Sequence, residues 1–537
     1  MPLTKTIERC VTNMTKYLIN RILRAVCSVV IVVGVIMTMI YSFLDKQSIF
    51  ATVPVFTKQK NNAKQVYMMQ QWELYGYMDY VPFADYLKEE LKAGNITEEE
   101  YADASVLGKK AENDSDLTAK WAESFIEEYE AKGYTIERLD GQMQGRSKKY
   151  RDGGEPRLYA YKEYSILHRL VTYFTDMITV DNIHNVDNIE GERGLTFTLY
   201  DPVYGGEKFS PAIMGNGTTH RYLFYMDDQF PYIHQNLVKI NLGKSYSVNK
   251  GVDVIDTMTQ SQGSFVRSTV TYPSGVVEET ADDLHTAIYV EGSLNAGSLN
   301  QKYFVDDYTS VTTAKAGMSK MGYSFSIGII AVILSYLVAV PLGIVMALKK
   351  DKFIDQLGTF YIVFITAVPS LGYIFIFKSI GGAMGFPTTF NMENPTTLMY
   401  VLPIVSLALP SIANLMKWLR RYMIDQMNSD YVKFARSGGL SEGEIFTKHI
   451  LKNAIIPIVH GIPASVLGAL TGAIITERVY VVPGTGNLLT NAINAYDNGV
   501  IVGVTLFYAV LTVVSIILGD VLMSVMDPRI SFTAKER

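Results

Sequence analysis

The sequence has 537 residues but only two cysteines, Cys10 and Cys27, and both lie in or before the first apolar run. The long block from residue 45 to residue 322 therefore cannot be stabilised by an internal disulfide. If this block lies outside the cell, its own apolar core must hold it together, and it is long enough to build one. The seven histidines show no zinc-ligand spacing, so the sequence predicts no metal site.

A phosphate-binding loop is also missing. The only similar string is LGKS at residues 242–245, and no glycine stands five residues before Gly243. We therefore expect no ATP site and no catalytic residue in this chain.

Charge is distributed unevenly. The formal net charge is −5 at pH 7, but residues 45–322 hold 40 Asp and Glu against 28 Lys and Arg, whereas the remainder holds 13 against 20. One contiguous block is thus acidic and the rest is basic. Because 48% of the residues are hydrophobic, this pattern favours a membrane protein that carries a large soluble part.

Six apolar runs are long enough to cross about 30 Å of hydrocarbon at about 1.5 Å per residue. They are residues 22–43, 323–348, 358–380, 397–416, 455–475 and 501–526. No small-residue cleavage site follows the first run, so we expect a retained span rather than a signal peptide. Five prolines fall within the apolar part of the chain, either as packing kinks or as part of a pathway: Pro341, Pro369, Pro403, Pro410 and Pro463.

Basic residues indicate the orientation of these runs. Lys and Arg precede the first run and follow those ending at 348, 416 and 526, whereas the loops 381–395 and 477–499 carry almost none. By the positive-inside rule, both termini are cytoplasmic and the acidic block is extracellular. The predicted divisions are a cytoplasmic tail 1–21, a first transmembrane helix 22–43, an extracellular domain 45–322, a five-helix transmembrane core 323–526 that includes a cytoplasmic loop 422–453, and a cytoplasmic tail 527–537.

The acidic block changes composition along its length. Residues 58–150 are rich in Glu, Lys, Ala and Leu, with apolar residues at helical spacing. Residues 157–305 are richer in β-branched and aromatic residues, punctuated by Gly and Pro. We expect an α+β domain, helical first and sheet-rich later. Its aromatic residues fit either a docking surface for a binding protein or an ordinary core.

A polar stretch, residues 428–453, interrupts the transmembrane core. NSDYVKFARSG predicts a short helix, Gly438-Gly439 a left-handed stop, and SEGEIFTKHILKN a second helix capped by Ser441 with Glu444 completing the capping box. A solvated loop is the alternative to a docking motif. Five apolar residues are too few to enter the bilayer but enough to dock into a groove of another protein: Phe434, Leu440, Ile445, Phe446 and Leu451.

This stretch also matches a family pattern, Y-V-x-x-A-R-x-x-G-L, then H-x-L-x-N, then a proline. The matching residues are Tyr431, Val432, Ala435, Arg436, Gly439, Leu440, His449, Leu451, Asn453 and Pro457. The pattern resembles the cytoplasmic loop of permease subunits of oligopeptide and dipeptide ABC importers. The more general form of this loop begins Glu-Ala-Ala, of which only Ala435 is present here.

Other stretches resemble the same family: VYVVPGTGNLLTNAI, ILGDVLMSVMDPRI and INLGKSYS. The resemblance covers residues 16–44 and about 323–537, with a fragment near 230–256. Most of the block between the first two spans looks inserted.

The resemblance implies a type I ABC importer permease fold of six transmembrane helices, here with an added α+β extracellular domain. It implies a plasma-membrane subunit that imports peptides. Its expected partners are a second permease subunit, two cytoplasmic ATP-binding subunits that hold ATP and Mg, and an extracellular peptide-binding lipoprotein, with no nucleic acid. The chain itself would hold no cofactor, and Gly439 would be the elbow through which closure of the ATPases moves the transmembrane helices.

Four polar residues in the membrane segments are candidates for the translocation path: Asn414, His460, Ser465 and Asp520. For Asp520, a structural pairing with Arg529 or another basic residue is the alternative. The others are alternatively bonded to neighbouring helices.

Two other classes of membrane protein also carry a large domain outside the membrane. A mechanotransmitting ABC membrane protein also has a large outer domain after its first span, but usually has four spans and lacks this cytoplasmic loop. A membrane sensor would have one or two spans followed by a signalling domain, and neither feature is present.

Overall fold

The structure is a computed structural model. It describes residues 2–43, 46–105, 116–145, 149–180, 189, 191–200, 209, 211–218, 222–226, 233–235, 238–260, 262, 268–271, 277–280, 283–289, 309–314, 318–392 and 396–526. The side chains of residues 2–18, 116–117, 222, 225–226, 233–235, 238–239, 268, 270–271, 278–280, 283–289 and 309–314 are excepted.

Five of the described helices are long and apolar enough to cross a membrane. The predicted runs 22–43, 323–348, 397–416 and 501–526 all lie within them. The five helices are the Ile19–Phe43 part of α1 (Pro2–Phe43), α10 (Lys320–Leu348), α13 (Val401–Met427) with the preceding turn η3 (Thr397–Tyr400), α17 (Ile462–Tyr480) and α19 (Asn498–Met526). The predicted run 455–475 is divided at Gly461 between α16 (Lys452–His460) and α17.

The predicted span 358–380 is sharply bent at its proline. Helices α11 (Phe353–Ala367) and α12 (Ser370–Ala383) meet at a bend of 113°. Pro369 causes the break, because a proline disfavours helical geometry in the residue before it, and Val368 is extended at φ −83° and ψ 129°. The pair forms either a broken span or a re-entrant segment, so the described residues provide five or six crossings.

The bundle is centred on α10 and α13, which pack along each other. Ala331, Ala339, Leu407 and Leu419 are among the side chains buried between the helices. A partly buried ion pair joins α11 to α13, because Arg420 Nη2 lies 2.7 Å from Asp355 Oδ2 and Arg420 Nε also contacts the carboxylate. This pair fixes the start of α11 against α13, whose helix continues beyond the predicted span 397–416 to Met427.

The first half of the 45–322 block forms a lobe that we call the helical lobe (residues 46–163). Its sheet has the order β1-β3-β2, with all neighbours antiparallel and with Tyr80 opposite Tyr161 and Ile136 opposite Ala160. Phe83, Leu87 and Phe125 form its core. The strands are β1 (Met78–Pro82), β2 (Thr135–Leu139) and β3 (Arg157–Glu163), and the helices are η1 (Ser48–Phe50), α2 (Pro54–Lys58), α3 (Asn61–Leu74), α4 (Phe83–Ala93), α5 (Glu98–Ala104) and α6 (Asp116–Ala131).

The second half is dominated by strands, in a part that we call the strand lobe (residues 178–314). A four-stranded antiparallel sheet has the order β5-β6-β7-β8, and three further antiparallel pairs are β4-β9, β10-β11 and β12-β13. The predicted order, helices first and sheet later, thus appears with an additional sheet in the first lobe. The strands are β4 (Ile178–Val180), β5 (Gly194–Thr198), β6 (Ala212–Asn216), β7 (Tyr222–Met226), β8 (Ile233–Gln235), β9 (Val238–Ile240), β10 (Ser268–Thr271), β11 (Val277–Thr280), β12 (Asp283–Tyr289) and β13 (Thr309–Ala314).

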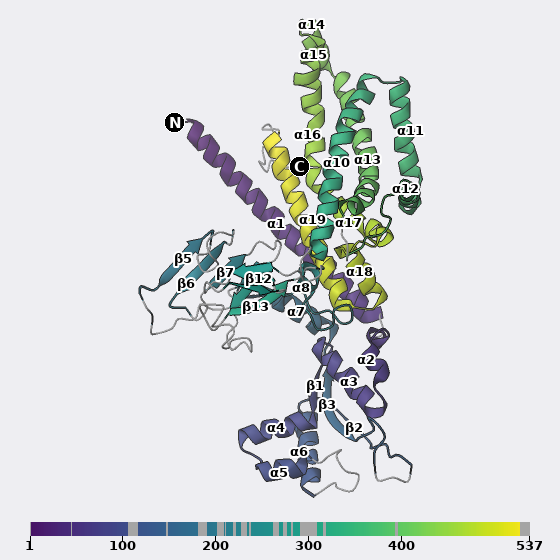
Figure 1. Cartoon of the computed structure of the whole chain (residues 1–537). Coiled ribbons are helices and arrows are strands. Elements are labelled where there is room, and N and C mark those ends of the chain that lie inside the picture. The colour runs from purple at the N-terminus through teal and green to yellow at the C-terminus, as the bar shows by residue number, and fades with distance from the viewer. Residues whose placement is uncertain are drawn as a thin grey trace.

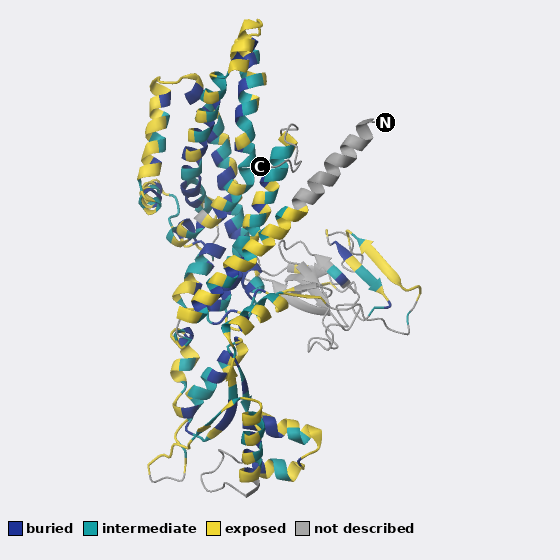
Figure 2. Ribbon diagram, turned by 180° about the vertical axis from the view of Figure 1, so that it is seen from behind, coloured by how far each residue is buried: buried dark blue, intermediate teal, exposed yellow. Residues whose placement is uncertain are grey.

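Both lobes lie toward one end of the bundle, and the polar hairpin of α14 (Asp430–Ser437) and α15 (Glu442–Glu444) lies at the other (Figure 1). The start of α1 and the end of α19 lie toward the hairpin end. Exposed residues predominate in the part of α1 from residue 19 to residue 43, and α1 inclines away from the bundle (Figure 2). The apolar helices therefore lie between the hairpin and the two lobes.

The lobes join the bundle through a second apolar cluster. Residues Val33 and Met37 of α1 pack with Val254 and Met258 of α8 (Val254–Thr259) and with Val502 of α19. Helix α7 (Ile166–Asp176) lies beside α1 at this junction, and α18 (Thr485–Asn494) also contributes. The base of the block is thus packed between the first and last membrane helices.

Candidate functional site

The polar hairpin turns at two glycines. Helix α14 ends as Gly439 N donates to Arg436 O at 3.1 Å and Leu440 N to Ala435 O at 3.3 Å. Gly439 has a φ of +84°, in the left-handed region where glycine carries no penalty. The predicted left-handed stop is present at Gly439, and it fixes the angle between the two helices.

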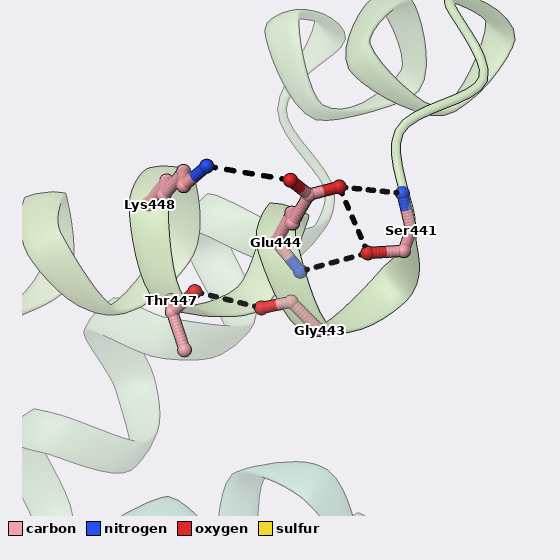
Figure 3. Close-up of polar contacts among 5 residues, drawn as sticks. All are labelled: Ser441, Gly443, Glu444, Thr447 and Lys448. Carbon is pink, nitrogen blue, oxygen red and sulfur yellow. Dashed lines mark hydrogen bonds and ion pairs between the residues drawn. The ribbon is translucent and has the colours of Figure 1, made fainter.

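The second helix starts with the predicted capping box, drawn in Figure 3. The hydroxyl of Ser441 accepts from Glu444 N at 3.3 Å, and the Glu444 carboxylate accepts from Ser441 N at 3.4 Å. Lys448 pairs with the same carboxylate at 3.3 Å, and the hydroxyl of Thr447 donates to Gly443 O at 2.8 Å. The bonds from Ser441 and Lys448 hold the pKa of Glu444 below its usual value.

An ion pair spans the turn between the helices. Arg436 Nη2 lies 3.0 Å from Glu442 Oε2, and Nε contacts the other oxygen, so the pair is bidentate. The hydrogen bond from Arg436 lowers the pKa of the Glu442 carboxyl. Because both side chains are exposed, this pair contributes little to global stability, but it restricts the turn.

The hairpin is anchored to the bundle by apolar and polar contacts. Val432 and Ile445 are fully buried and Ala435 is 8% exposed, all within the core of the bundle. Tyr431 OH donates to His449 O at 3.3 Å and accepts from Asn453 Nδ2 at 3.0 Å. The structure thus brings Tyr431, His449 and Asn453 of the predicted motif together. A π-helical segment, η4 (Ile445–Leu451), continues directly into α16.

One apolar side chain of the hairpin points to solvent far more than the others. Phe434 is 80% exposed and Leu440 is 40% exposed. Ile445, which the sequence placed among the docking residues, is instead buried under the hairpin, so its role is internal. The surface available to another protein is therefore narrower than predicted.

Two of the four path candidates share a groove. Asn414 and Ser465 line a groove of about 530 Å³ bounded by α10, α13, α16 and α17. Tyr336 OH lies 3.2 Å from Ser465 Oγ and 3.3 Å from Ile458 O. Pro410 and Pro457 line it as well, so the motif proline faces this groove rather than the hairpin surface.

The other two candidates lie outside this groove and make contacts between helices. His460 Nδ1 lies 2.8 Å from Gly519 O, which joins α16 to α19. Asp520 Oδ2 lies 2.9 Å from Arg21 Nε, which joins α19 to α1. The structural pairing expected as the alternative for Asp520 is therefore present, with Arg21 as its partner, while Arg529 lies outside the described residues.

Sequence reasoning missed the role of Glu477, at the end of α17. Its carboxylate accepts from Ser324 Oγ at 2.6 Å and from Asn487 N at 3.0 Å, and its side chain is buried. A Cβ placed on Gly484 would lie 2.3 Å from this carboxylate. Gly484 of the PGTG stretch is thus required because the turn wraps around a buried acid, whereas a Cβ on Gly486 would lie 2.6 Å from Ile474 Cα. The only sequence signal was the motif itself.

A second missed residue, Asp497, precedes α19. Its carboxylate accepts from Ser245 Oγ at 2.6 Å and from the backbone N–H groups of Tyr246, Ser247 and Val248 at 2.8–2.9 Å. It also caps α19 by accepting from Val500 N at 3.2 Å. The LGKS string therefore ends in a turn that binds a carboxylate of the same chain, and no sequence pattern indicated that partner.

Groups of three or more side chains suited to holding a metal are not found among the described residues. The hairpin combines a rigid base with an exposed aromatic tip, an arrangement that can receive a mechanical displacement. The groove combines polar groups with an apolar surround, an arrangement that can pass a polar solute.

The chain matches known proteins at two levels. The model of the family described as "Binding-protein-dependent transport system inner membrane component" matches residues 339–532. The oligopeptide transport system permease protein AmiC of Streptococcus pneumoniae is 32% identical over 530 residues, which cover 97% of this chain and 99% of that protein. This alignment includes nearly all of the block 45–322.

Shorter relatives match less of the chain. The dipeptide transport system permease protein DppB of Bacillus subtilis is 29% identical over 214 residues, covering 40% of this chain and 68% of that protein. Among solved structures, an amino acid ABC transporter crystallised with histidines covers 39% of this chain and 92% of its own, at 17% identity and a TM-score of 0.31.

Proposed function

The chain belongs to the binding-protein-dependent transport system inner membrane components, in the branch of oligopeptide and dipeptide permeases, and we propose that its hairpin couples peptide import to ATPases on partner subunits. The observation that carries this proposal is the hairpin itself. Phe434 is exposed at its tip, while Val432 and Ile445 are buried at its base. An exposed aromatic residue on a rigid support is the kind of anchor that fills a pocket on a partner.

Motion would pass from the hairpin to the membrane helices through a continuous path. The second hairpin helix runs through η4 into α16, which borders the groove. When the ATP-binding subunits close, a displaced hairpin would move α16 against α13 and alter the groove between them. ATP and Mg are held by those partners, and this chain contributes no cofactor.

The groove supports a role as this subunit's share of the translocation path. Polar side chains in membrane segments usually face a bundle interior or a water-filled cavity, and Asn414, Ser465 and Tyr336 fit this rule. A second permease subunit would supply the facing wall. His460 and Asp520 would act only as contacts between helices.

The same topology supports the proposed orientation. The hairpin and both ends of the membrane part lie toward one end, and the lobes lie toward the other (Figure 1). Lys and Arg accompany the hairpin end. We therefore place the chain in the plasma membrane with cytoplasmic termini, a cytoplasmic loop 422–453 and an extracellular block 45–322, on which a peptide-binding lipoprotein would dock.

Phe434→Ala tests the docking role in the assembled complex. We expect the variant chain to fold normally, to lose most ATP-binding subunit on co-purification, and to lose peptide uptake. Phe197→Ala is the matched control, because Phe197 is 67% exposed but lies in the strand lobe. Equal ATPase recovery for both variants would contradict the proposal.

Gly439→Pro tests the elbow separately. Proline cannot adopt a φ of +84° and would remove the hydrogen bond from Gly439 N to Arg436 O, so the angle of the turn must change. We expect assembly to persist while ATP hydrolysis no longer drives peptide uptake. Uptake at the wild-type rate would exclude the elbow role.

The alternative function, a mechanotransmitting ABC membrane protein without solute transport, makes a different prediction. Such a protein would co-purify with ATPase subunits but with no second permease and no peptide-binding protein. Co-purification of the intact complex therefore distinguishes the two functions.

A further inference from the structure

An arginine is buried at the junction of the lobes and the bundle. Arg169 belongs to α7, where Ser165 caps the helix by accepting from His168 N at 3.2 Å. Its side chain is only 8% exposed. The guanidinium carbon lies 3.5 Å from the ring centre of Tyr41, at the end of α1, and 3.6 Å from that of Tyr77. The guanidinium therefore contacts two aromatic rings, whose planes are inclined at 69° to each other.

The charge of Arg169 has no counter-ion in the described part of the chain. Its one hydrogen bond there runs from Nε to Gly76 O, at 2.9 Å, and no carboxylate of the described residues lies within 4 Å. The Nη2 atom is buried without an acceptor. A buried cation without a partner is costly, and contact with aromatic rings offsets only part of that cost.

An asparagine with an unpaired oxygen lies in the same place. Asn498, the first residue of α19, donates from Nδ2 to Tyr77 OH at 3.0 Å. Its Oδ1 is buried and has no donor among the described residues. The site therefore lacks both an acceptor for the arginine and a donor for the amide oxygen, as it would if a ligand with an anionic group and a hydroxyl or N–H group were absent.

Arg169 and Asn498 both line a cavity of about 270 Å³. The exposed Lys244 and Asp176 are the other charged residues of its lining, while Met37 of α1 and Val502 of α19 supply an apolar part. The cavity lies where α1 ends and α19 begins, at the lobe end of the membrane helices (Figure 1). In the proposed orientation this is the outer surface of the bilayer.

We propose that this cavity binds the phosphate headgroup of an anionic phospholipid of the outer leaflet. The phosphate would pair with Arg169 and Lys244, and a headgroup hydroxyl or N–H group would donate to Asn498. The exposed apolar side chains of Val26 and Val30, which lie on the same face of α1 as Met37, would contact the acyl chains. Acyl contact is what favours a lipid over a free oxyanion.

A lipid is also favoured over the transported peptide. The groove with Asn414 and Ser465 is formed by α10, α13, α16 and α17, whereas this cavity is lined by α1, α7 and α19. A volume of about 270 Å³ suits a headgroup rather than a peptide of several residues. The proposed lipid site uses the proposed orientation but not the coupling role of the hairpin, so either can fail alone.

The test uses the full-length chain in nanodiscs of phosphatidylcholine mixed with phosphatidylglycerol, and counts retained lipids by native mass spectrometry. We expect one retained phosphatidylglycerol in the wild type. Arg169→Gln should reduce its retention about ten-fold, because a charge-assisted hydrogen bond is lost. Arg157→Gln is the matched control, since Arg157 is an exposed arginine of the helical lobe, and it should retain the lipid.

A second variant separates binding from folding. Asn498→Asp has the same shape, can accept from Tyr77 OH in place of the bond that Asn498 donates to it, and places a carboxylate in the cavity beside the anion. We expect a wild-type melting temperature and the same ten-fold loss of lipid.

Three results would overturn the proposal. They are equal retention of both lipids by the wild type, unchanged retention in the folded Asn498→Asp variant, and displacement of phosphatidylglycerol by millimolar inorganic phosphate or by a peptide with a free carboxylate. Phosphate would identify a free-anion site, and the peptide would identify a substrate subsite.

Discussion

At the scale of single residues, Asp497 shows how one carboxylate can serve two elements. It is fully buried, binds the turn at residues 245–248 and caps α19. Backbone N–H groups that converge on one point form an anion site. Here the anion is internal, so the turn joins the base of the block to the last membrane helix.

Asp497→Asn should destabilise this junction. An amide supplies one acceptor oxygen in place of two and turns its own NH2 group toward N–H donors. We therefore expect the free energy of unfolding to fall by about 2–4 kcal/mol. Thermal unfolding in detergent measures it. Asp253→Asn is the control, since Asp253 lies nearby but its side chain makes no capping bond. Equal melting temperatures for the two variants would contradict this role.

The turn of the hairpin should loosen in acid. The pKa values of Glu442 and Glu444 are lowered in the folded chain by Arg436 and by Ser441. The two carboxylates therefore stabilise the turn fully above the pKa of about 4.3 that a glutamate has in the unfolded chain. This stabilisation is lost as the pH falls through their lower pKa values in the folded chain. Hydrogen exchange at residues 438–444, corrected for its intrinsic pH dependence, should show reduced protection below about pH 4.3.

Replacing both glutamates by glutamine provides the control for this effect. Glutamine retains an acceptor for the capping box but does not titrate in this range. The double variant should therefore lose the acid dependence of exchange. Persistent acid loosening in the variant would assign the effect to other groups.

At the scale of elements, the break between α17 and α18 depends on the absence of a side chain. Gly484 has ordinary backbone angles, φ −92° and ψ 177°, so strain of the backbone does not explain the glycine. The Glu477 carboxylate explains the glycine instead, because a Cβ on Gly484 would lie only 2.3 Å from it. The turn is therefore built around its buried acid.

Gly484→Ala should destabilise the chain by about 1–3 kcal/mol through this steric overlap. Gly468→Ala, in the same segment of chain, is the control because a Cβ there meets nothing within 4 Å. Comparing their melting temperatures tests the explanation. If Gly484→Ala melts like the wild type, the carboxylate has room to move.

Elements also differ in how well local sequence predicts them. The hairpin was predictable, because its cap, its glycine stop and its periodicity all lie within about 25 residues. The bend of 113° within the predicted span 358–380 was not, although Pro369 was visible. A proline in an apolar run either kinks a helix or breaks it, and the packing around it decides which.

At the scale of the whole molecule, the orientation can be tested by labelling. A chain with Cys10 and Cys27 replaced by serine would receive one new cysteine, at Phe434 or at Leu195. Both positions are exposed, at 80% and 62%. We expect a membrane-impermeant maleimide to label Leu195→Cys in intact cells, and Phe434→Cys only after lysis.

The reverse labelling pattern would invert the proposed topology. Labelling of both positions in intact cells would show instead that cell integrity was lost, which a cytoplasmic marker protein reports. The orientation and the docking of partners are therefore tested independently.

The sequence by itself determined the membrane class, most of the spans, the helical-then-strand order of the block and the local form of the hairpin. Each follows from hydrophobic runs, periodicity or caps, which act between neighbours in the chain. Tertiary structure alone decided that Asp497 binds a turn about 250 residues away, that Glu477 sits within the PGTG turn and that Arg169 is buried between Tyr41 and Tyr77. These pairings depend on packing between distant segments, and a single sequence carries no local signal for them.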